Sequence, residues 1–293
     1  MVTASKKRGY RVISKDLEVY PLTLPLIVDD IDNLEFHYKK EKEIKSLLEA
    51  SLKDLRDYKA LEEIKSLTFK VLNLEQGGND WLEVRQGLAT GSNLPIDNKG
   101  NLIPTINKYV AKKALEVFQN EIECVELKQE IKQALHIPYT KAMERGHVLE
   151  PLAKEEYVKY REAQGDLVEI EHIGFIKSDN LPFGASPDGV AVDLLTFERV
   201  NLEIKTTNIA NFTNYIIDPQ SFVDNHYKQV QIEMLVTQTD KTHLICYYPD
   251  FDLIVQEVSI DYEFIGNFIE SMKEYSELLK IALNGLRKAY KGK

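Results

Sequence analysis

Three side chains that could act together on a phosphodiester bond lie in the stretch FGASPDGVAVDLLTFERVNLEIKTT, residues 183–207. Asp188 follows a proline, and Glu203 and Lys205 are separated by a single residue near the end of the stretch. The segment is typical of an antiparallel hairpin. If it closes across a turn at 195–199, Asp188 comes next to the end of the returning strand. The sequence therefore predicts two carboxylates and one ammonium group at one place.

The returning strand separates its residues into an apolar and a polar face, because alternate side chains of a strand point to the same side. We expect Val200, Leu202 and Ile204 to face the core, and Asn201, Glu203 and Lys205 to line a cleft. Mg²⁺ binds a few carboxylates together with water and phosphate oxygens. A nearby lysine can orient a water molecule or neutralise charge in the transition state. The pattern indicates metal-assisted hydrolysis, although such charges also occur on the solvated faces of ordinary hairpins.

The residues around the hairpin predict an α/β fold in which helices wrap a sheet. Helical patterns occur at 105–135, 138–164, 225–238 and 262–291. Strand-like patterns occur at 168–176, 189–193, 200–205, 242–250 and 253–260. The hairpin thus lies between a preceding helix and a following helix, and both could contribute side chains to its polar face.

The N-terminal part of the chain has a different character. Residues 1–35 show no clear period, whereas 35–74 are rich in charge and carry apolar residues at helical spacing. This pattern predicts one or two amphipathic helices. A Gly-Gly break and a short helix with the only tryptophan, Trp81, follow. We therefore expect a helical extension over 1–74 and a second domain, ending in a long helix, over 75–293.

Composition excludes several classes of protein. The formal net charge of −10 over 293 residues argues against a protein that passively coats DNA, because such proteins are usually basic. Two cysteines are too few for a four-cysteine zinc or iron–sulfur site. The sequence shows no secretory signal and no run of about 18 apolar residues, so we expect an intracellular protein that does not span a membrane.

Taken together, these motifs resemble the PD-(D/E)xK nucleases of the phage lambda exonuclease and YqaJ-type viral recombinase family. SPDG at 186–189, followed by LEIK at 202–205, is similar to the family signature. Glu150 matches an acid on the preceding helix, and the segment HYKQVQIEMLVT at 226–237 matches the helix after the signature. The resemblance covers about 75–260. It implies a restriction-endonuclease-like core with a mixed central sheet flanked by helices, and it makes 75–293 the exonuclease domain.

The resemblance also implies roles for single residues. The implied metal ligands are Asp188, Glu203, Glu150 and the carbonyl oxygen of Ile204, around two Mg²⁺ or Mn²⁺ ions. Lys205 would position the attacking water, and Gln229 or Gln231 would steady Lys205 or the DNA backbone. Pro151 cannot donate a helical hydrogen bond, so the helix could bend there and tip Glu150 inward.

An upstream block, WLEVRQGLATGSN at 81–93, resembles the segment with which the family recognises a DNA end. It implies that Arg85 and Ser92 bind a 5′-phosphate and that Ser186 completes the pocket, with Tyr227 as a further DNA contact. A guanidinium can bind a phosphate through two parallel hydrogen bonds. Because the chain is acidic, DNA would need a local basic surface. The candidates are Lys108, Lys112, Lys113, Lys141, Arg145 and the segment 285–293.

The activity implied by the resemblance is exonucleolytic degradation of linear double-stranded DNA from 5′ to 3′, which leaves 3′ single-stranded tails for recombination by strand annealing. The expected partners are DNA ends, a single-strand annealing protein and further copies of the chain in a ring trimer. The expected setting is the cytoplasm of a bacterial host of a phage or prophage. Two other interpretations stay open: an endonuclease of restriction or repair type, and a catalytically silent module that binds DNA ends or a partner.

Overall fold

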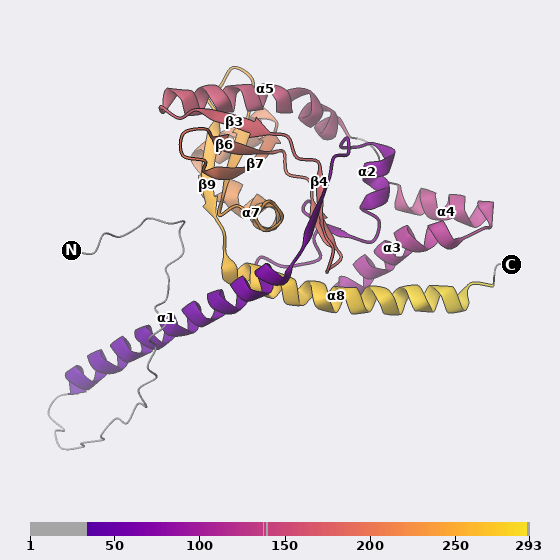
Figure 1. Cartoon of the computed structure of the whole chain (residues 1–293), viewed down its shortest axis with the longest axis horizontal. Helices are drawn as coiled ribbons and strands as arrows, with labels where there is room; N and C mark the ends of the chain where they lie inside the picture. Colours follow the sequence, from indigo (N-terminus) through magenta and orange to yellow (C-terminus); the bar gives the residue numbers. More distant parts are fainter. Residues whose placement is uncertain (1–33, 137, 139, 292–293) are drawn as a thin grey trace. The chain divides into compact units, whose positions relative to one another are not determined.

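The computed structural model of the chain describes residues 34–136, 138 and 140–291, with side chains from Lys45 onward (Figure 1). Residues 1–33, which make up most of the stretch 1–35 for which no period was expected, lie outside the described part. The helices are α1 Leu34–Ser66, α2 Asn79–Val84, α3 Ile106–Phe118, α4 Val125–Leu135, α5 Lys141–Ala163, α6 Ile209–Ile217, α7 Pro219–Thr237 and α8 Tyr262–Ala289, with a 3₁₀ turn η1 at Gln119–Glu121. The strands are β1 Phe69–Leu72, β2 Ala89–Thr90, β3 Val168–Glu171, β4 Phe175–Ser178, β5 Phe183–Ala185, β6 Gly189–Asp193, β7 Arg199–Thr206, β8 Lys241–Tyr247 and β9 Ile254–Ser259.

The chain forms two compact units, residues 1–49 and residues 50–293. The described part of the first unit is the first half of α1. The second unit holds all the strands and the remaining helices, so β1 belongs with the sheets. Among the described helices, none is long and apolar enough to cross a membrane.

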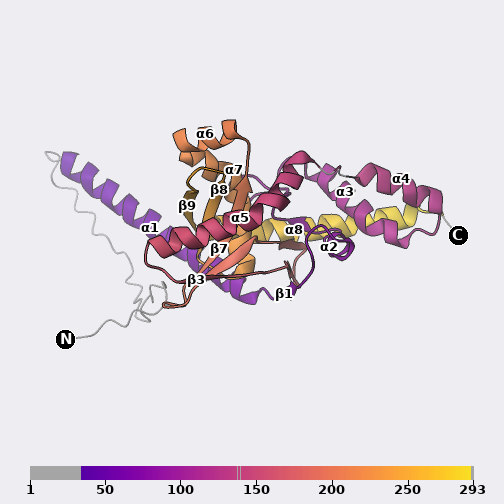
Figure 2. The same cartoon turned by 90° about the horizontal axis from the view of Figure 1, so that it is seen from above.

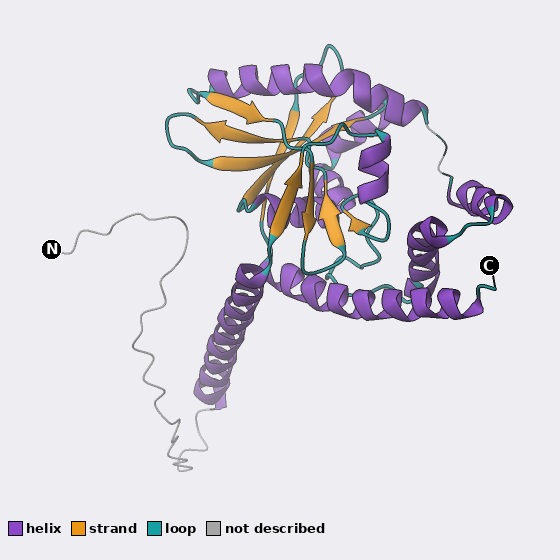
Figure 3. Cartoon of the chain, turned by 45° about the vertical axis from the view of Figure 1, so that its right-hand side comes forward, coloured by secondary structure: helices purple, strands orange, loops and turns teal. Residues whose placement is uncertain are grey.

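The strands form two mixed sheets, which confirms the expected fold class. The five-stranded sheet has the order β3-β6-β7-β8-β9, in which only β7 and β8 pair in parallel. The four-stranded sheet has the order β1-β4-β5-β2, in which β2 and β5 are parallel. Figure 3 shows these strands between flanking helices.

Helices cover both faces of the five-stranded sheet. α5 packs on one face, where Ala153 and Tyr157 contact Leu202 and Ile204 of β7 in a buried cluster. α7 lies on the other face (Figure 1), and Figure 2 shows α5 running across the strands from above. A larger core joins β5, α3, α7 and α8, with Phe268 at its centre among fully buried side chains. β7 is therefore covered by a helix on each side, which explains why its polar face is buried as well.

One expected helix is in part a strand. The helical pattern assigned to 35–74 ends at Ser66, and β1 follows, paired with β4. Phe69 in β1 packs edge-on against Phe183, with ring centroids 6.2 Å apart. Aromatic and branched side chains favour strands when a partner strand is available, so tertiary pairing outweighs the local helical pattern.

Two further elements differ from the expected pattern. The strand expected at 168–176 is two strands in different sheets, and Gly174 directly precedes the second of them. A Cβ atom at Gly174 would lie 2.2 Å from the carbonyl oxygen of Leu72, so only glycine allows β1 to approach here. The helix expected over 105–135 is divided into α3, η1 and α4.

Candidate active site

The hairpin of β6 and β7 brings Asp188 against the end of β7. Gly189 pairs with Leu202 in the antiparallel register, so Asp188 lies beside the next residues of β7. Its Oδ2 atom accepts a hydrogen bond of 2.6 Å from the backbone N–H of Ile204. Asp188 and Glu203 therefore lie close together, as expected if the hairpin closes across its turn. The described contact uses the amide of Ile204, not its carbonyl oxygen.

Lys205, Glu203 and Gln229 form a closed ring of polar contacts beneath α7. The ammonium group of Lys205 pairs with Oε1 of Glu203. It also donates to Oε1 of Gln229 at 3.0 Å, and Nε2 of Gln229 donates to Oε1 of Glu203 at 2.7 Å. The amide of Gln229 thus holds the glutamate and the lysine of the ExK motif in one geometry.

The ring extends to an acid that the sequence analysis missed. Glu233 is 1% exposed, and its oxygens accept hydrogen bonds from Gln229 at 2.9 Å and from Asn201 at 3.2 Å. Asn201 also donates to Oγ1 of Thr242 at 3.0 Å. The available signal was the spacing from Gln229, because residues four apart lie on the same face of a helix.

Acidic groups outnumber basic ones in this buried cluster. Burial raises the pKa of Asp188 well above its usual value, and the charges of Glu203 and Glu150 raise it further. Burial, followed by the charge of Glu203, likewise raises the pKa of Glu233. For Lys205, burial lowers the pKa, but the carboxylates of Glu203 and Asp188 outweigh it, so the net pKa is raised. Lys205 is therefore a cation at neutral pH, and the cluster favours additional positive charge.

The donor atoms fit a hard divalent cation. Oε2 of Glu203 is buried and has no hydrogen-bond partner, which leaves one carboxylate oxygen available beside Asp188. No group of three or more His, Cys, Asp or Glu residues with metal-binding geometry occurs in the described part of the chain. The two adjoining carboxylates therefore suit a Mg²⁺ ion, which usually keeps several waters or takes substrate oxygens as its other ligands.

Glu150 approaches the site from α5 but is engaged by another residue. Its Oε1 atom accepts from Nζ of Lys154 at 2.6 Å. Both side chains line a cavity of about 350 Å³ that also contains Asp188 and Ser186. Pro151 lies inside α5, which bends in its N-terminal half (Figure 1). Glu150 is thus on the cavity wall, separate from the ring formed by Lys205, Glu203 and Gln229.

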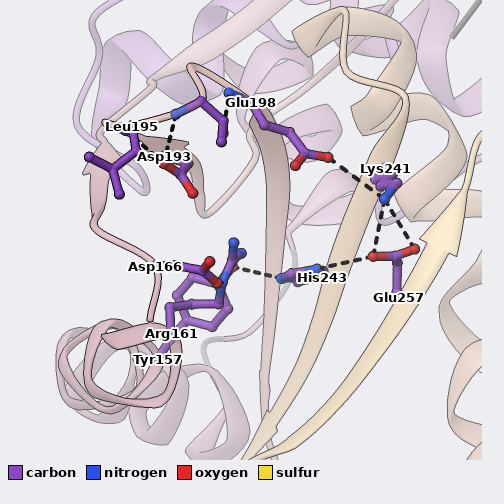
Figure 4. A network of polar contacts seen from close by, with 10 residues as sticks. Tyr157, Arg161, Asp166, Asp193, Leu195, Glu198, Lys241, His243 and Glu257 are labelled. Atoms are coloured by element: carbon purple, nitrogen blue, oxygen red, sulfur yellow. Dashed lines mark hydrogen bonds and ion pairs between the residues drawn. The ribbon is translucent and has the colours of Figure 1, made fainter. Parts of the chain in front are cut away.

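A second polar cluster anchors the C-terminal half of α5 to the sheet (Figure 4). The hydroxyl oxygen of Tyr157 lies 2.6 Å from Nδ1 of His243 in β8 and accepts a hydrogen bond of 2.9 Å from Arg161. Arg161 also pairs with Asp166 at 2.7 Å. Tyr157 is fully buried. These contacts join α5 to the sheet and so limit movement of the helix that carries Glu150.

The residues expected to bind a phosphate meet at one edge of the second sheet. Arg85 donates to Oγ1 of Thr90 at 3.0 Å, and its guanidinium lies 3.7 Å from the centroid of the Trp81 ring. Nε1 of Trp81 donates to Oγ of Ser186 at 2.9 Å. Burial lowers the pKa of Arg85 to about 10, so it stays charged at neutral pH. In the described part of the chain, no carboxylate lies within ion-pair distance of Arg85.

Ser92 reaches the same edge through strand pairing. β2 and β5 run parallel, and the N–H of Gly91 donates to the carbonyl of Gly184 at 3.2 Å. Ser92 and Ser186 follow these strands at the same end, and Ser92 is exposed. Arg85 and Ser186 thus both contact Trp81, and Ser92 lies in the turn after β2, the strand that pairs with β5 just before Ser186.

The family model of the YqaJ-like viral recombinase domain matches residues 80–240. The chain belongs to this family. The resemblance drawn from the motifs is thereby confirmed, and the matched residues include the hairpin, Glu150, Arg85 and Gln229. No curated protein matches the sequence.

Solved structures share the fold of this YqaJ-like domain. LHK-Exo in complex with dAMP superposes with a TM-score of 0.55 at 20% identity, over 72% of this chain and 98% of that one. A crystal structure described as an alkaline exonuclease (LHK-Exo) from Laribacter hongkongensis has a TM-score of 0.51 at 20% identity, over 72% and 97% of the two chains. At this identity the likeness establishes a common fold.

The YqaJ-like domain does not bring two of the expected residues into the cluster. The hydroxyl of Tyr227 donates to Oδ2 of Asp261 at 2.6 Å, at the start of α8. Gln231 donates to the carbonyl of Ser259 at 2.9 Å and accepts from the N–H of Asp261 at 2.8 Å. Both side chains thus join α7 to the segment between β9 and α8. Of the two glutamines considered, Gln229 is the one beside Lys205.

One residue of the expected basic surface, Lys113, cannot contact DNA. Lys113 is buried and pairs with Glu116 at 2.9 Å, so it is not available to DNA. Lys108 and Lys141 are exposed, whereas Arg145 is partly buried and its Nε atom has no hydrogen-bond partner.

Proposed function

We propose that this protein is a metal-dependent DNA exonuclease that hydrolyses linear double-stranded DNA from 5′-phosphorylated ends in the 5′ to 3′ direction. The observation that carries the proposal is the ring of Glu203, Lys205 and Gln229 adjoining Asp188. It places an acid pair with a free carboxylate oxygen next to a fixed ammonium group. The similarity in fold to LHK-Exo, an alkaline exonuclease, supports the same class of reaction.

The residues of the ring would divide the work. Asp188 and Glu203 would hold one Mg²⁺ or Mn²⁺ ion, with the carbonyl of Ile204 as a further ligand, and Glu150 would serve a second ion. A cation bound there polarises the scissile phosphate and lowers the pKa of a bound water. Because the pKa of Lys205 is raised, its ammonium group donates hydrogen bonds and does not act as a base. Lys205 would therefore orient the attacking water and neutralise charge on the phosphate, while Gln229 keeps it in place.

Recognition of the DNA end would depend on Arg85, Ser92 and Ser186. Arg85 keeps its charge, is stacked on Trp81 and has no carboxylate competing for its guanidinium in the described part of the chain. A terminal phosphate offers it two oxygens in the geometry that arginine prefers. Binding of the 5′-phosphate at this edge would make the enzyme act from 5′ ends and leave 3′ single-stranded tails. Those tails are the substrate of a single-strand annealing protein, which we propose as a partner, together with assembly into a ring of like subunits.

The proposal is tested by digesting linear duplex DNA that carries either a 5′-phosphate or a 5′-hydroxyl, with Mg²⁺ or with EDTA. A closed circular duplex and the Asp188→Ala protein are run in parallel. We expect metal-dependent loss of the 5′-phosphorylated strand, an intact circle and no cleavage by the variant. A nicked or linearised circle would instead identify an endonuclease, and no cleavage under any condition would indicate a module that only binds.

A further inference from the structure

The cavity beside Asp188 contains a single strong cation. Among the described residues that line it, Lys154 is the only lysine or arginine, whereas Glu75, Glu150 and Asp188 are acids. The side chains of Lys154 and Glu150 are 20% and 27% exposed, and Nζ of Lys154 lies 2.6 Å from Oε1 of Glu150. A phosphate that enters this cavity therefore meets Lys154, and to bind it must compete with Glu150.

The pair between Lys154 and Glu150 is easily exchanged. Ion pairs between residues four apart on one helix contribute little to stability, and both side chains of this pair stay partly exposed. A terminal phosphate carries a charge of about −1.5 to −2 at pH 7 and three acceptor oxygens, more than the single charge and two oxygens of a carboxylate. A DNA phosphate can thus displace Glu150 from Lys154 at a small cost in free energy.

The charges around Asp188 give this exchange a consequence. Lys205 pairs with Glu203 and Lys154 pairs with Glu150, whereas Asp188 forms no ion pair within the described part of the chain. Glu150 is close enough to Asp188 to contribute to its raised pKa. If Lys154 moves to a phosphate, the carboxylates of Glu150 and Asp188 face the same cavity without a cation between them. Two such groups attract a divalent ion.

We infer that Lys154 couples DNA binding to cation binding: it neutralises Glu150 in the free protein, and a DNA phosphate draws it away and releases Glu150 to bind a second divalent cation. The inference rests on the proposed function, because it assigns a regulator to the same site. The free enzyme then holds one divalent ion, and the second ion binds only when the substrate strand is present. Lys154 is a positioning residue for this step, since it acts through Glu150.

The test measures cation binding directly. Ca²⁺, which takes the same kind of oxygen ligands, is titrated calorimetrically into wild type, Lys154→Met and Lys159→Met. Each titration is made with and without a short 5′-phosphorylated duplex protected by phosphorothioate linkages. Fluorescence is followed at the same time, because the chain has a single tryptophan and Trp81 lines the cavity. Lys159 is the matched control, since it pairs with Glu156 at 2.8 Å on the same helix but does not line the cavity.

In wild type and Lys159→Met we expect DNA to add one bound Ca²⁺ per chain. In Lys154→Met we expect this additional Ca²⁺ to bind even when DNA is absent. In EDTA, Lys154→Met should bind the duplex more weakly, and the slope of log affinity against log salt should fall by about one. Lys154→Arg, which keeps the charge, should behave as wild type, and a Tm within a few degrees of wild type checks folding of every variant.

The outcomes separate the inference from the proposed function. Identical Ca²⁺ titrations for Lys154→Met and Lys159→Met, or an unchanged salt dependence of DNA binding, would overturn the coupling by Lys154. Absence of any Ca²⁺ binding to wild type, with or without DNA, would instead contradict the metal-dependent function itself.

Discussion

Nε2 of Gln229 lies 2.7 Å from Oε1 of Glu203, and this contact joins α7 to the hairpin of β6 and β7. The same amide accepts a hydrogen bond from Lys205. The ExK strand is thus held by a helix that begins thirteen residues after the strand ends, at Pro219. The position of α7 therefore helps to fix the ammonium group of Lys205.

Replacement of Gln229 by Leu should lower kcat by about 10- to 100-fold, because hydrogen bonds to charged groups contribute about 1.5–3 kcal/mol. Gln229→Glu should lower kcat further than Gln229→Leu, since it places an additional carboxylate against Glu203. Single-turnover cleavage of a 5′-phosphorylated duplex measures the effect. Gln231→Leu is an informative comparison: it should reduce stability through the lost contacts to Ser259 and Asp261 and should leave the rate per folded molecule nearly unchanged.

Glu233→Gln should be tolerated better than Glu233→Leu. Burial raises the pKa of Glu233, which favours an uncharged side chain at this position. The side-chain carbonyl of a glutamine can still accept hydrogen bonds from Gln229 and Asn201. Leucine removes one hydrogen bond from each of these amides, which keep their bonds to Glu203 and Thr242, at a cost of about 0.5–1.5 kcal/mol for each bond. Urea unfolding at neutral pH compares the free energies of the two variants. Equal losses of stability in both would contradict a role based on hydrogen bonding.

Mg²⁺ should raise the Tm of the wild-type protein and leave that of Asp188→Asn unchanged. A ligand that binds only the folded state stabilises it by about 2.7 kcal/mol at a hundredfold excess over Kd. In EDTA, Asp188→Asn should be at least as stable as wild type, because its raised pKa shows that the buried carboxylate is unfavourable. Thermal melts with EDTA and with increasing Mg²⁺ measure both effects. A variant that still gains stability from Mg²⁺ would place the ion elsewhere.

Arg85→Lys should remove the preference for 5′-phosphorylated ends while the charge is kept. Lysine cannot form the bidentate contact or the planar stack on Trp81. We expect the ratio of cleavage rates for 5′-phosphate and 5′-hydroxyl ends to fall by about tenfold or more, with little change for the hydroxyl substrate. Equal loss on both ends would indicate a structural role for the contact with Thr90 instead.

His226 should make the protein less stable in mild acid. Burial, followed by the nearby charge of Lys205, lowers its pKa to about 4, whereas an unfolded histidine has a pKa of about 6.5. Between these values the unfolded state binds more protons, so stability falls as the pH decreases from about 6.5 toward 4. Asp188 and Glu233 have raised pKa values, so they make the folded state more stable as the pH decreases, which opposes the effect of His226.

Comparison of wild type with His226→Gln isolates the histidine from those acids. We expect the Tm of His226→Gln to decrease less than that of wild type between pH 7 and pH 5. The substitution also weakens packing against Phe222, whose ring centroid lies 5.4 Å from that of His226, but this loss is the same at both pH values. Parallel pH dependences would show that His226 is not the group that titrates.

The sequence by itself determined the local parts of the site. Asp188, Glu203 and Lys205 belong to one hairpin, and the two-residue period of a strand and the closing turn are sufficient to place them together. The family, the fold class and the meeting of Arg85 with Ser186 were also accessible, because they depend on motifs that occur in order along the chain.

Only the tertiary structure decided how the helices face the hairpin. Gln229 and Gln231 are two residues apart, so they point to different sides of α7, and the rotation of the helix on the sheet selects Gln229. That rotation results from packing of buried residues such as Val230 and Ile232 into different cores, which no local pattern encodes. The same packing buries Glu233 beside the site, and long-range pairing with β4 makes a strand of Phe69–Leu72. Short-range spacing therefore identifies the chemistry, and contacts between distant segments determine which neighbours surround it.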